Sequence, residues 1–264
     1  LSSFIHSLRI IKSSSEIDLM KLSAITASRA MAETMKASNA GISEAFLHAY
    51  FEFECRKNGA DALAYPPVVA GGRRANILHY TKNSQLIVDD ELVLVDAGCD
   101  YRCYSSDISR TWPINGRFNR AQRQLYEAIL DVQETCIKAC KPGISLNDLY
   151  VIMQKQLESN VVGKFILLQI CNNLCPHHVG HYLGMDVHDT TSISTTKQLE
   201  EHMVITVEPG IYIPHDADYI HTEFRGIGIR IEDNLLITPN NHEVITSMCP
   251  KTVNAIEETM SNQS

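Results

Sequence analysis

The sequence predicts an α+β fold that forms a single domain from two similar halves. Helical spacing of apolar residues gives way to short runs of β-branched residues, and this order of two helices followed by strands occurs twice along the 264 residues. No stretch rich in proline, glycine and serine and no block of charge separates the halves. We therefore expect them to share one sheet and one core.

The first half opens with two helices. Ser15 and Asp18 form a capping-box start for the first helix, whose apolar pattern ends before Gly41. The second helix begins at Ser43 and ends before Gly59. Strand-like runs follow at residues 65–72, 75–80, 91–98 and 103–114.

The second half repeats this order. Asn119 opens a helix that ends before Gly143, and Ser145 with Asp148 caps the next one. Strand-like runs then cover residues 176–184, 203–213 and 226–238. The motifs VDAG and VEPG each place an acid at the end of an apolar strand, and a second strand with another acid follows each of them. We interpret the repeat as a pseudo-duplication.

Four acidic residues lie on these strands or at their ends, namely Asp96, Asp107, Glu208 and Glu232. Pairing of residues 91–96 with 103–113 would bring the two aspartates together, and a similar pairing would join the two glutamates. Taken alone, Asp96 could be a turn residue before Gly98. Four converging carboxylates, however, repel one another and are costly to bury without compensating charge. The pattern therefore favours two divalent ions bridged by carboxylates.

A metal site of this kind also needs a neutral nitrogen donor. Four histidines cluster within a short segment, namely His177, His178, His181 and His188. One histidine in isolation is more often structural, but this cluster beside Gly180 and Gly184 favours a site. Arg230 lies two positions before Glu232, on the same strand face, and could orient a ligand carboxylate. The alternative for Arg230 is a surface ion pair.

Composition excludes several classes of function. With 23 Lys and Arg against 31 Asp and Glu, the net charge of −8 argues against nucleic acid as a partner. No apolar run approaches the roughly 20 residues that span a bilayer, so we expect no membrane partner. The sequence lacks the motifs of dinucleotide, P-loop and serine-hydrolase sites. The eight cysteines indicate reduced, partly buried thiols.

Five motifs carry a resemblance to a known family: VDAG, SDISRTWP, HHVGHYLGMDVHD, TVEPGIY and GIRIEDNLLIT. Over residues 8–256 the chain resembles the pita-bread metallopeptidases of family M24, specifically aminopeptidase P. With NGRF and YPPVVAGG it looks most like the mitochondrial branch of that group. The resemblance implies the pita-bread (creatinase/aminopeptidase) fold, in which two pseudo-symmetric halves each join helices to an antiparallel sheet.

The resemblance also implies roles for individual residues. The ligands of two divalent metal ions would be Asp96, Asp107, His181, Glu208 and Glu232, with Asp107 and Glu232 bridging. His79, His177 and His188 would line the substrate site, and Tyr65 and Tyr212 would bind substrate. Family members commonly use manganese (Mn²⁺), and four carboxylates with one imidazole agree with that ion without excluding cobalt, iron or zinc.

The implied activity is that of a metalloaminopeptidase, which removes the N-terminal residue from peptides with proline in second position. A metal-activated hydroxide would attack the first peptide carbonyl, Glu208 would act as the proton shuttle, and His177 or His188 would stabilise the tetrahedral intermediate. Two alternatives stay open: a prolidase-type dipeptidase that cleaves Xaa-Pro dipeptides, and a non-catalytic pita-bread module that serves protein interaction.

The resemblance further implies a domain organisation. Residues 1–256 would form the catalytic domain and 257–264 a C-terminal tail, and the N-terminal creatinase-like domain of the family is not found in this sequence. The full-length protein could be a homodimer. We expect a mitochondrial location, with the cytoplasm as the alternative. Residues 157–175 look shorter and more apolar than the helical spacer that family members carry before HHVGH.

Overall fold

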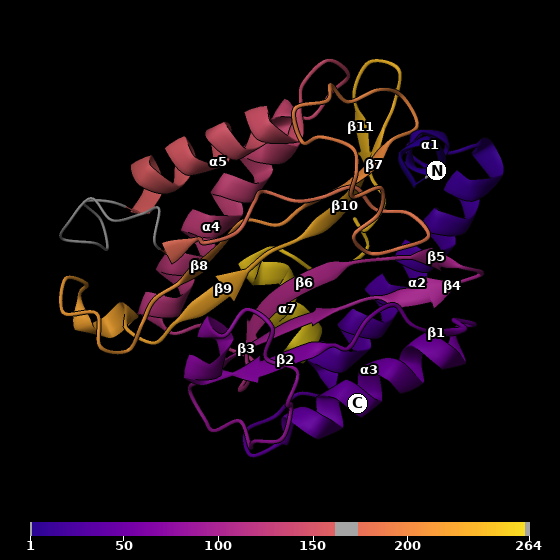
Figure 1. Cartoon of the computed structure of the whole chain (residues 1–264). Helices are drawn as coiled ribbons and strands as arrows, with labels where there is room; N and C mark the ends of the chain where they lie inside the picture. Colours follow the sequence, from indigo (N-terminus) through magenta and orange to yellow (C-terminus); the bar gives the residue numbers. More distant parts are fainter. Residues whose placement is uncertain (1, 162–173, 262–264) are drawn as a thin grey trace.

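The computed structural model describes residues 2–161 and 174–261, in which helices cover small antiparallel sheets (Figure 1). The helices are α1 (Ser2–Arg9), α2 (Ser14–Lys36), α3 (Glu44–Lys57), α4 (Arg120–Ala139), α5 (Leu146–Val161) and α7 (Val253–Ser261). The strands of the first half are β1 (Ala62–Leu63), β2 (Val68–Gly71), β3 (Leu92–Ala97), β4 (Cys99–Tyr101), β5 (Tyr104–Ser105) and β6 (Ile108–Pro113). Those of the second half are β7 (Val204–Val207), β8 (Gly210–Tyr212), β9 (Gly228–Arg230), β10 (Asp233–Ile237) and β11 (His242–Val244).

Three of the four predicted helix starts are confirmed. Ser43, Asn119 and Ser145 precede α3, α4 and α5, where their side chains accept bonds from backbone amides of the first turn. The start predicted at Ser15 is wrong by two residues. Ser13 caps α2 instead, because the Glu16 carboxylate reaches back to the Ser13 amide at 2.8 Å and completes the capping box.

Two predicted strands are absent from the described residues. In residues 75–80 the chain leaves the 3-10 turn η1 (Gly72–Asn76), and the buried Tyr80 hydroxyl donates to Glu44 at 2.9 Å. In residues 176–184 only Tyr182 forms a β-bridge, to Ile205 of β7. Residues 179–183 nevertheless run beside β7, because the Thr206 amide donates to the His181 carbonyl at 2.9 Å and the Leu183 amide donates to the Val204 carbonyl at 3.0 Å.

The strands form four small sheets within the described residues, so the prediction of one shared sheet is wrong. Their orders are β1-β4-β5, β2-β3-β6, β7-β10-β11 and β8-β9. The halves nevertheless meet strand against strand, because the Glu232 amide donates to the Ser109 carbonyl at 3.0 Å and the Thr111 hydroxyl donates to the Arg230 carbonyl at 3.1 Å. The halves share a main core, as predicted, since one buried cluster contains Phe51, Trp112 and Ile205 from both halves; two smaller buried clusters in the described part of the chain lie apart from it.

The long helices pack against the sheets, α2 on β4 and β5, α3 on β2, and α4 on β7 (Figure 1). On β3, Val93 and Val95 belong to the main core, whereas Leu94 belongs to a separate cluster on the opposite face. Because side chains alternate along a strand, Asp96 lies on the face of Leu94. Antiparallel pairing of β3 with β6 then sets Asp96 opposite Ser109, as the hairpin prediction requires.

The C-terminal segment is part of the folded domain. Helix α7 continues past residue 256 to Ser261, so the predicted boundary of the tail falls inside a helix. Glu257 accepts bonds from the Phe118 amide and from Arg123, and Met260 is buried. Most of the segment 157–175, which the sequence marks as unusual, lies outside the described residues. Among the described helices, none combines the length and apolar character that crossing a bilayer requires.

Candidate metal centre

A cavity of about 890 Å³ lies where the two halves meet. All five predicted metal ligands line it, namely Asp96, Asp107, His181, Glu208 and Glu232. The first two come from the β3–β6 hairpin and the other three from the second half of the chain. Residues that are far apart in sequence therefore meet at one cavity, as predicted from the strand pairing.

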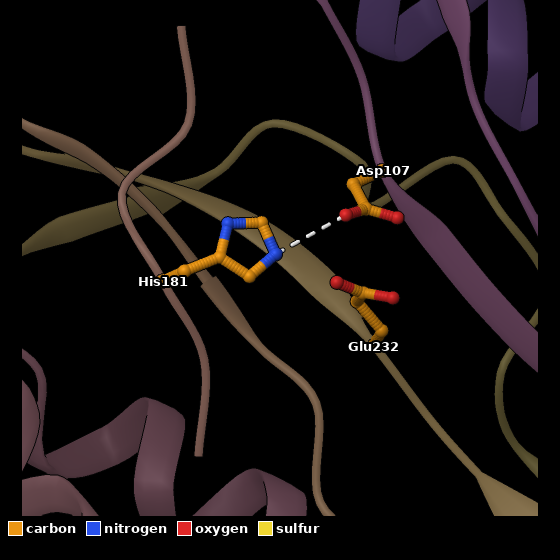
Figure 2. A group of neighbouring side chains, drawn as sticks. All are labelled: Asp107, His181 and Glu232. Atoms are coloured by element: carbon orange, nitrogen blue, oxygen red, sulfur yellow. Dashed lines mark ion pairs between the residues drawn. The ribbon is translucent and has the colours of Figure 1, made fainter. Parts of the chain in front are cut away.

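Asp107, His181 and Glu232 form the centre of this group (Figure 2). One ligand atom from each lies within 4.8 Å of the others. The His181 Nε2 atom is 3.3 Å from Asp107 Oδ2 and 3.6 Å from Glu208 Oε1. Gly180 allows this approach, since a Cβ atom there would meet the Thr206 carbonyl oxygen at 2.0 Å.

Asp96 is held beside this centre by two donors. Arg230 donates to Asp96 Oδ2 at 2.6 Å, and the Tyr65 hydroxyl, with one proton to donate, lies 2.6 Å from Asp96 Oδ1 and also contacts Asp107. Asp96 is a strand residue and not a turn residue. Arg230 is buried, so the interpretation as a surface ion pair is wrong and its predicted role in orienting a carboxylate agrees with the contact.

Glu232 shows that the group is suited to a cation. Its Oε2 atom accepts from the Ser109 hydroxyl at 2.8 Å, but its Oε1 atom is buried and has no hydrogen-bond partner in the described structure. Burial raises the pKa of Glu232 well above its ordinary value, and the carboxylates of Asp107 and Glu208 raise it further. An unpartnered carboxylate oxygen among like charges is compensated when a metal ion binds. Carboxylates and an imidazole are also the donors that divalent ions such as Mn²⁺ accept.

Two further pKa shifts mark the cavity as electrostatically unusual. Burial raises the pKa of Glu208 to about 7, although the neighbouring His181 opposes the shift. Burial lowers the pKa of His177 to about 4. At neutral pH, His177 is therefore an uncharged imidazole.

The predicted substrate residues lie in two positions. His79, His177, His188 and Tyr65 line the cavity. Tyr212 does not belong to the lining: it is buried behind Arg230, accepts from that guanidinium at 2.7 Å and lies 2.8 Å from His177 Nε2. Tyr65 lies in the cavity wall with its hydroxyl in contact with two predicted metal ligands.

Sequence reasoning missed three polar residues that hold the ligands. Ser109 bonds both Glu232 and Arg230, and Thr206 accepts from the His181 amide at 3.1 Å. The Asn234 side chain accepts from the Asp107 backbone amide at 3.1 Å and donates to the Asp107 backbone carbonyl at 2.5 Å. Each of the three lies two residues from a predicted acid, so the two-residue period of the strands could have identified them.

The sequence profile of metallopeptidase family M24 matches residues 18–239. This chain belongs to family M24. It is 51% identical to Xaa-Pro aminopeptidase 3 of Mus musculus over 98% of this chain and 53% of that protein. It is 43% identical to intermediate cleaving peptidase 55, mitochondrial, of Arabidopsis thaliana over 99% of this chain and 53% of that protein. The chain therefore spans about half the length of these M24 relatives.

A solved structure gives the same result for the fold. Zinc-substituted Escherichia coli aminopeptidase P in complex with product superposes with a TM-score of 0.95 at 34% identity, covering 99% of this chain and 62% of that chain. The expected pita-bread fold is thereby confirmed. The resemblance to aminopeptidase P, which rests on five short motifs, is also confirmed over nearly the whole chain.

Proposed function

We propose that this chain is the catalytic part of an Xaa-Pro aminopeptidase, which removes the N-terminal residue from peptides with proline in second position. The observation that supports this proposal most strongly is that Asp107, His181 and Glu232 meet at one cavity. Among the described residues, the buried Glu232 Oε1 atom there has no hydrogen-bond partner. Similarity to proteins named for this activity supports the substrate class. In a non-catalytic module, burying these three side chains together would cost stability without supplying a metal site.

The residues that would hold two divalent cations are Asp96, Asp107, His181, Glu208 and Glu232, with Asp107 and Glu232 shared between the two. We propose manganese as the physiological ion, because four of the five donors are carboxylates. When bound, such ions would polarise a peptide carbonyl and lower the pKa of a water molecule.

Side chains of the cavity would transfer the proton and donate hydrogen bonds during the reaction. Glu208 is the proposed proton shuttle, because its carboxylate lines the cavity and lies 3.6 Å from His181 Nε2. The His177 ring is fully engaged, because its Nδ1 lies 2.8 Å from the His178 carbonyl and its Nε2 lies 2.8 Å from the Tyr212 hydroxyl. Nδ1 must therefore donate and Nε2 accept. This leaves His188 as the better candidate to donate to a developing oxyanion.

The cavity walls suit a proline ring. Val68, Leu78, Leu146 and Ile193 contribute apolar lining. An Xaa-Pro bond has no amide N–H, so recognition has to depend on packing of the ring and on contacts to the carbonyl. Apolar walls beside a carboxylate cluster provide both.

The test compares metal-stripped and manganese-loaded protein on Xaa-Pro-Yaa peptides and on Xaa-Pro dipeptides. We expect manganese-dependent release of the first residue from the longer peptides, and loss of that activity in Glu208→Ala. Glu243→Gln, at an exposed ion pair with Lys21, is the matched control and should behave as wild type. Cleavage of dipeptides alone would favour a prolidase, and a folded protein that binds no metal would favour an interaction module.

We further propose a mitochondrial location, because the Arabidopsis thaliana relative carries that location in its name. Fractionation of cells that express the complete protein, followed by protease protection of the mitochondria, tests it. Sedimentation of the complete protein tests whether it is a homodimer.

A further inference from the structure

Residues 184–192, here called the His188 loop, line one wall of the cavity. Asp186, Val187, His188 and Asp189 all contribute to this wall. The His188 ring meets the His181 ring edge to face, with 4.5 Å between their centroids. The conformation of this short loop therefore sets where His188 lies relative to the predicted metal ligands.

Two basic side chains from the N-terminal segment, Arg9 and Lys12, form ion pairs with the His188 loop. Lys12, between α1 and α2, lies 3.2 Å from Asp189 Oδ2. Arg9, at the end of α1, bonds the other Asp189 oxygen and also Asp186, the latter at 2.7 Å. The side chains of Lys12 and Asp189 are only 2% and 1% exposed, so each charge depends on the other for compensation.

Two further features show that this contact is built into the loop. Gly184 leaves room for it, since a Cβ atom there would meet Asp189 Oδ2 at 2.3 Å and Lys12 Cε at 3.2 Å. Thr190, the residue after Asp189, has a φ of +49°, which is unfavourable for a β-branched side chain. Strained residues of this kind persist only where surrounding contacts fix them.

Helix α1 makes its contact with the domain mainly through such polar bonds. It contributes no buried side chain, and its large apolar residues Phe4 and Leu8 are exposed. His6 accepts from the Ser192 amide at 3.1 Å, at the far end of the His188 loop. The segment from His6 to Lys12 thus contacts the loop at Asp186, Asp189 and Ser192.

We propose that Arg9 and Lys12 are positioning residues, which hold the His188 loop through Asp189 and thereby place His188 for catalysis. This inference rests on the proposed function. It adds that residues outside the cavity, in a segment that precedes the region matched by the M24 profile, control the geometry of the site.

The experiment uses Arg9→Gln, Arg9→Lys and Asp189→Asn in the metal-loaded protein. Lys21→Gln, which breaks the exposed ion pair with Glu243, is the matched control. Three quantities are measured for each: kcat and KM on an Xaa-Pro-Yaa peptide, bound metal per chain, and hydrogen exchange of the backbone amides in residues 184–192. Asp189→Asn leaves Lys12 buried beside a neutral partner, which impairs folding. The main test is therefore Arg9, whose side chain is 25% exposed.

We expect Arg9→Gln to accelerate hydrogen exchange in the His188 loop and to lower kcat at least about tenfold, since small misplacements of a catalytic group are costly. The loss should fall on kcat more than on KM, because His188 is proposed to act on the reacting carbonyl. Metal content should not change, Arg9→Lys should recover most of the activity, and Lys21→Gln should match wild type.

Unchanged exchange in Arg9→Gln would overturn the proposal, and so would faster exchange with kcat and KM both unchanged. If the wild-type protein cleaves no Xaa-Pro peptide, the proposed function fails separately. In that case the hydrogen-exchange data alone test whether Arg9 holds the His188 loop. Faster exchange in Arg9→Gln still supports this role, and unchanged exchange rejects it.

Discussion

At the scale of single residues, the site depends on a chain of hydrogen bonds that leads away from the cavity. Arg230 bonds Asp96 on one side and Tyr212 on the other, and Tyr212 in turn bonds His177. The four acids could be predicted from strand ends and spacing and His181 from the family resemblance, but this relay could not. It depends on the contact of β8 with β9, which no local pattern shows.

Removing the Tyr212 hydroxyl tests the relay. In Tyr212→Phe, both Arg230 Nη1 and His177 Nε2 lose their partner, so we expect kcat/KM on an Xaa-Pro peptide to fall about tenfold, which corresponds to about 1.4 kcal/mol. The free energy of unfolding should drop by about 1–2 kcal/mol. Tyr104→Phe removes a hydroxyl bonded to Glu16 outside the cavity and serves as control. Equal activity of the two variants would reject the relay.

The Glu16 carboxylate, which accepts hydrogen bonds from Ser13 and Tyr104, gives a prediction with a defined pH dependence. Burial acts to raise the pKa of Glu16, but bonds from Ser13 and Tyr104 outweigh it, and the pKa lies below its ordinary value of 4.5. A carboxyl group with a lowered folded pKa stabilises the protein above its ordinary pKa, and this contribution is lost as the pH falls further. Glu16→Gln should therefore cost about 1 kcal/mol at pH 7 and markedly less below about pH 4. Urea unfolding of wild type and Glu16→Gln at both pH values measures the difference in their free energies of unfolding. A difference that does not change with pH would contradict this role of the Glu16 hydrogen bonds.

At the scale of elements, helices and hairpins were predictable and loops were not. Caps at Ser43, Asn119 and Ser145 and the β3–β6 pairing follow from local chemistry, and they appear as predicted. Beside the failed strand at residues 75–80, contacts from a distant side chain hold the chain in place. Glu44 of α3 is the example, because its buried carboxylate accepts from the Gly71 and Gln85 amides and from Arg74. It thereby fixes the segment that carries His79.

Glu44→Gln tests this role. An amide side chain offers one acceptor oxygen where the carboxylate offers two, so some of these buried donors lose their partner. We expect a loss of about 1–3 kcal/mol in the free energy of unfolding. Glu52→Gln, which affects an exposed pair with Arg56 on the same helix, should cost less than about 0.5 kcal/mol. Similar losses in both variants, measured by chemical denaturation, would refute the assignment.

At the scale of the molecule, the predicted metal ligands join the two halves. Asp96 and Asp107 belong to the first half, and His181, Glu208 and Glu232 belong to the second. The pseudo-duplication explains why both halves contribute acids. The strands of the described residues are nevertheless divided into four sheets, and Glu208, Glu232 and Asp107 lie between consecutive strands of the chain.

Bound metal should therefore stabilise the whole domain. At a free concentration one hundred times the dissociation constant, a ligand adds about 2.7 kcal/mol to folding, or roughly 5–10 °C in Tm for a chain of this size. We expect Mn²⁺ to raise the Tm of stripped wild-type protein by this amount and to leave that of Glu232→Gln nearly unchanged. Thermal denaturation followed by circular dichroism measures both; equal responses would place the ion elsewhere.

Stepwise addition of Mn²⁺ to stripped protein, with bound ions and peptide cleavage recorded at each step, tests the central claim most directly. We predict that cleavage of an Xaa-Pro-Yaa peptide develops as the chain binds up to two ions, and that Asp107→Asn abolishes both binding and cleavage. Cleavage that is complete without bound metal, or binding that survives in Asp107→Asn, would contradict it.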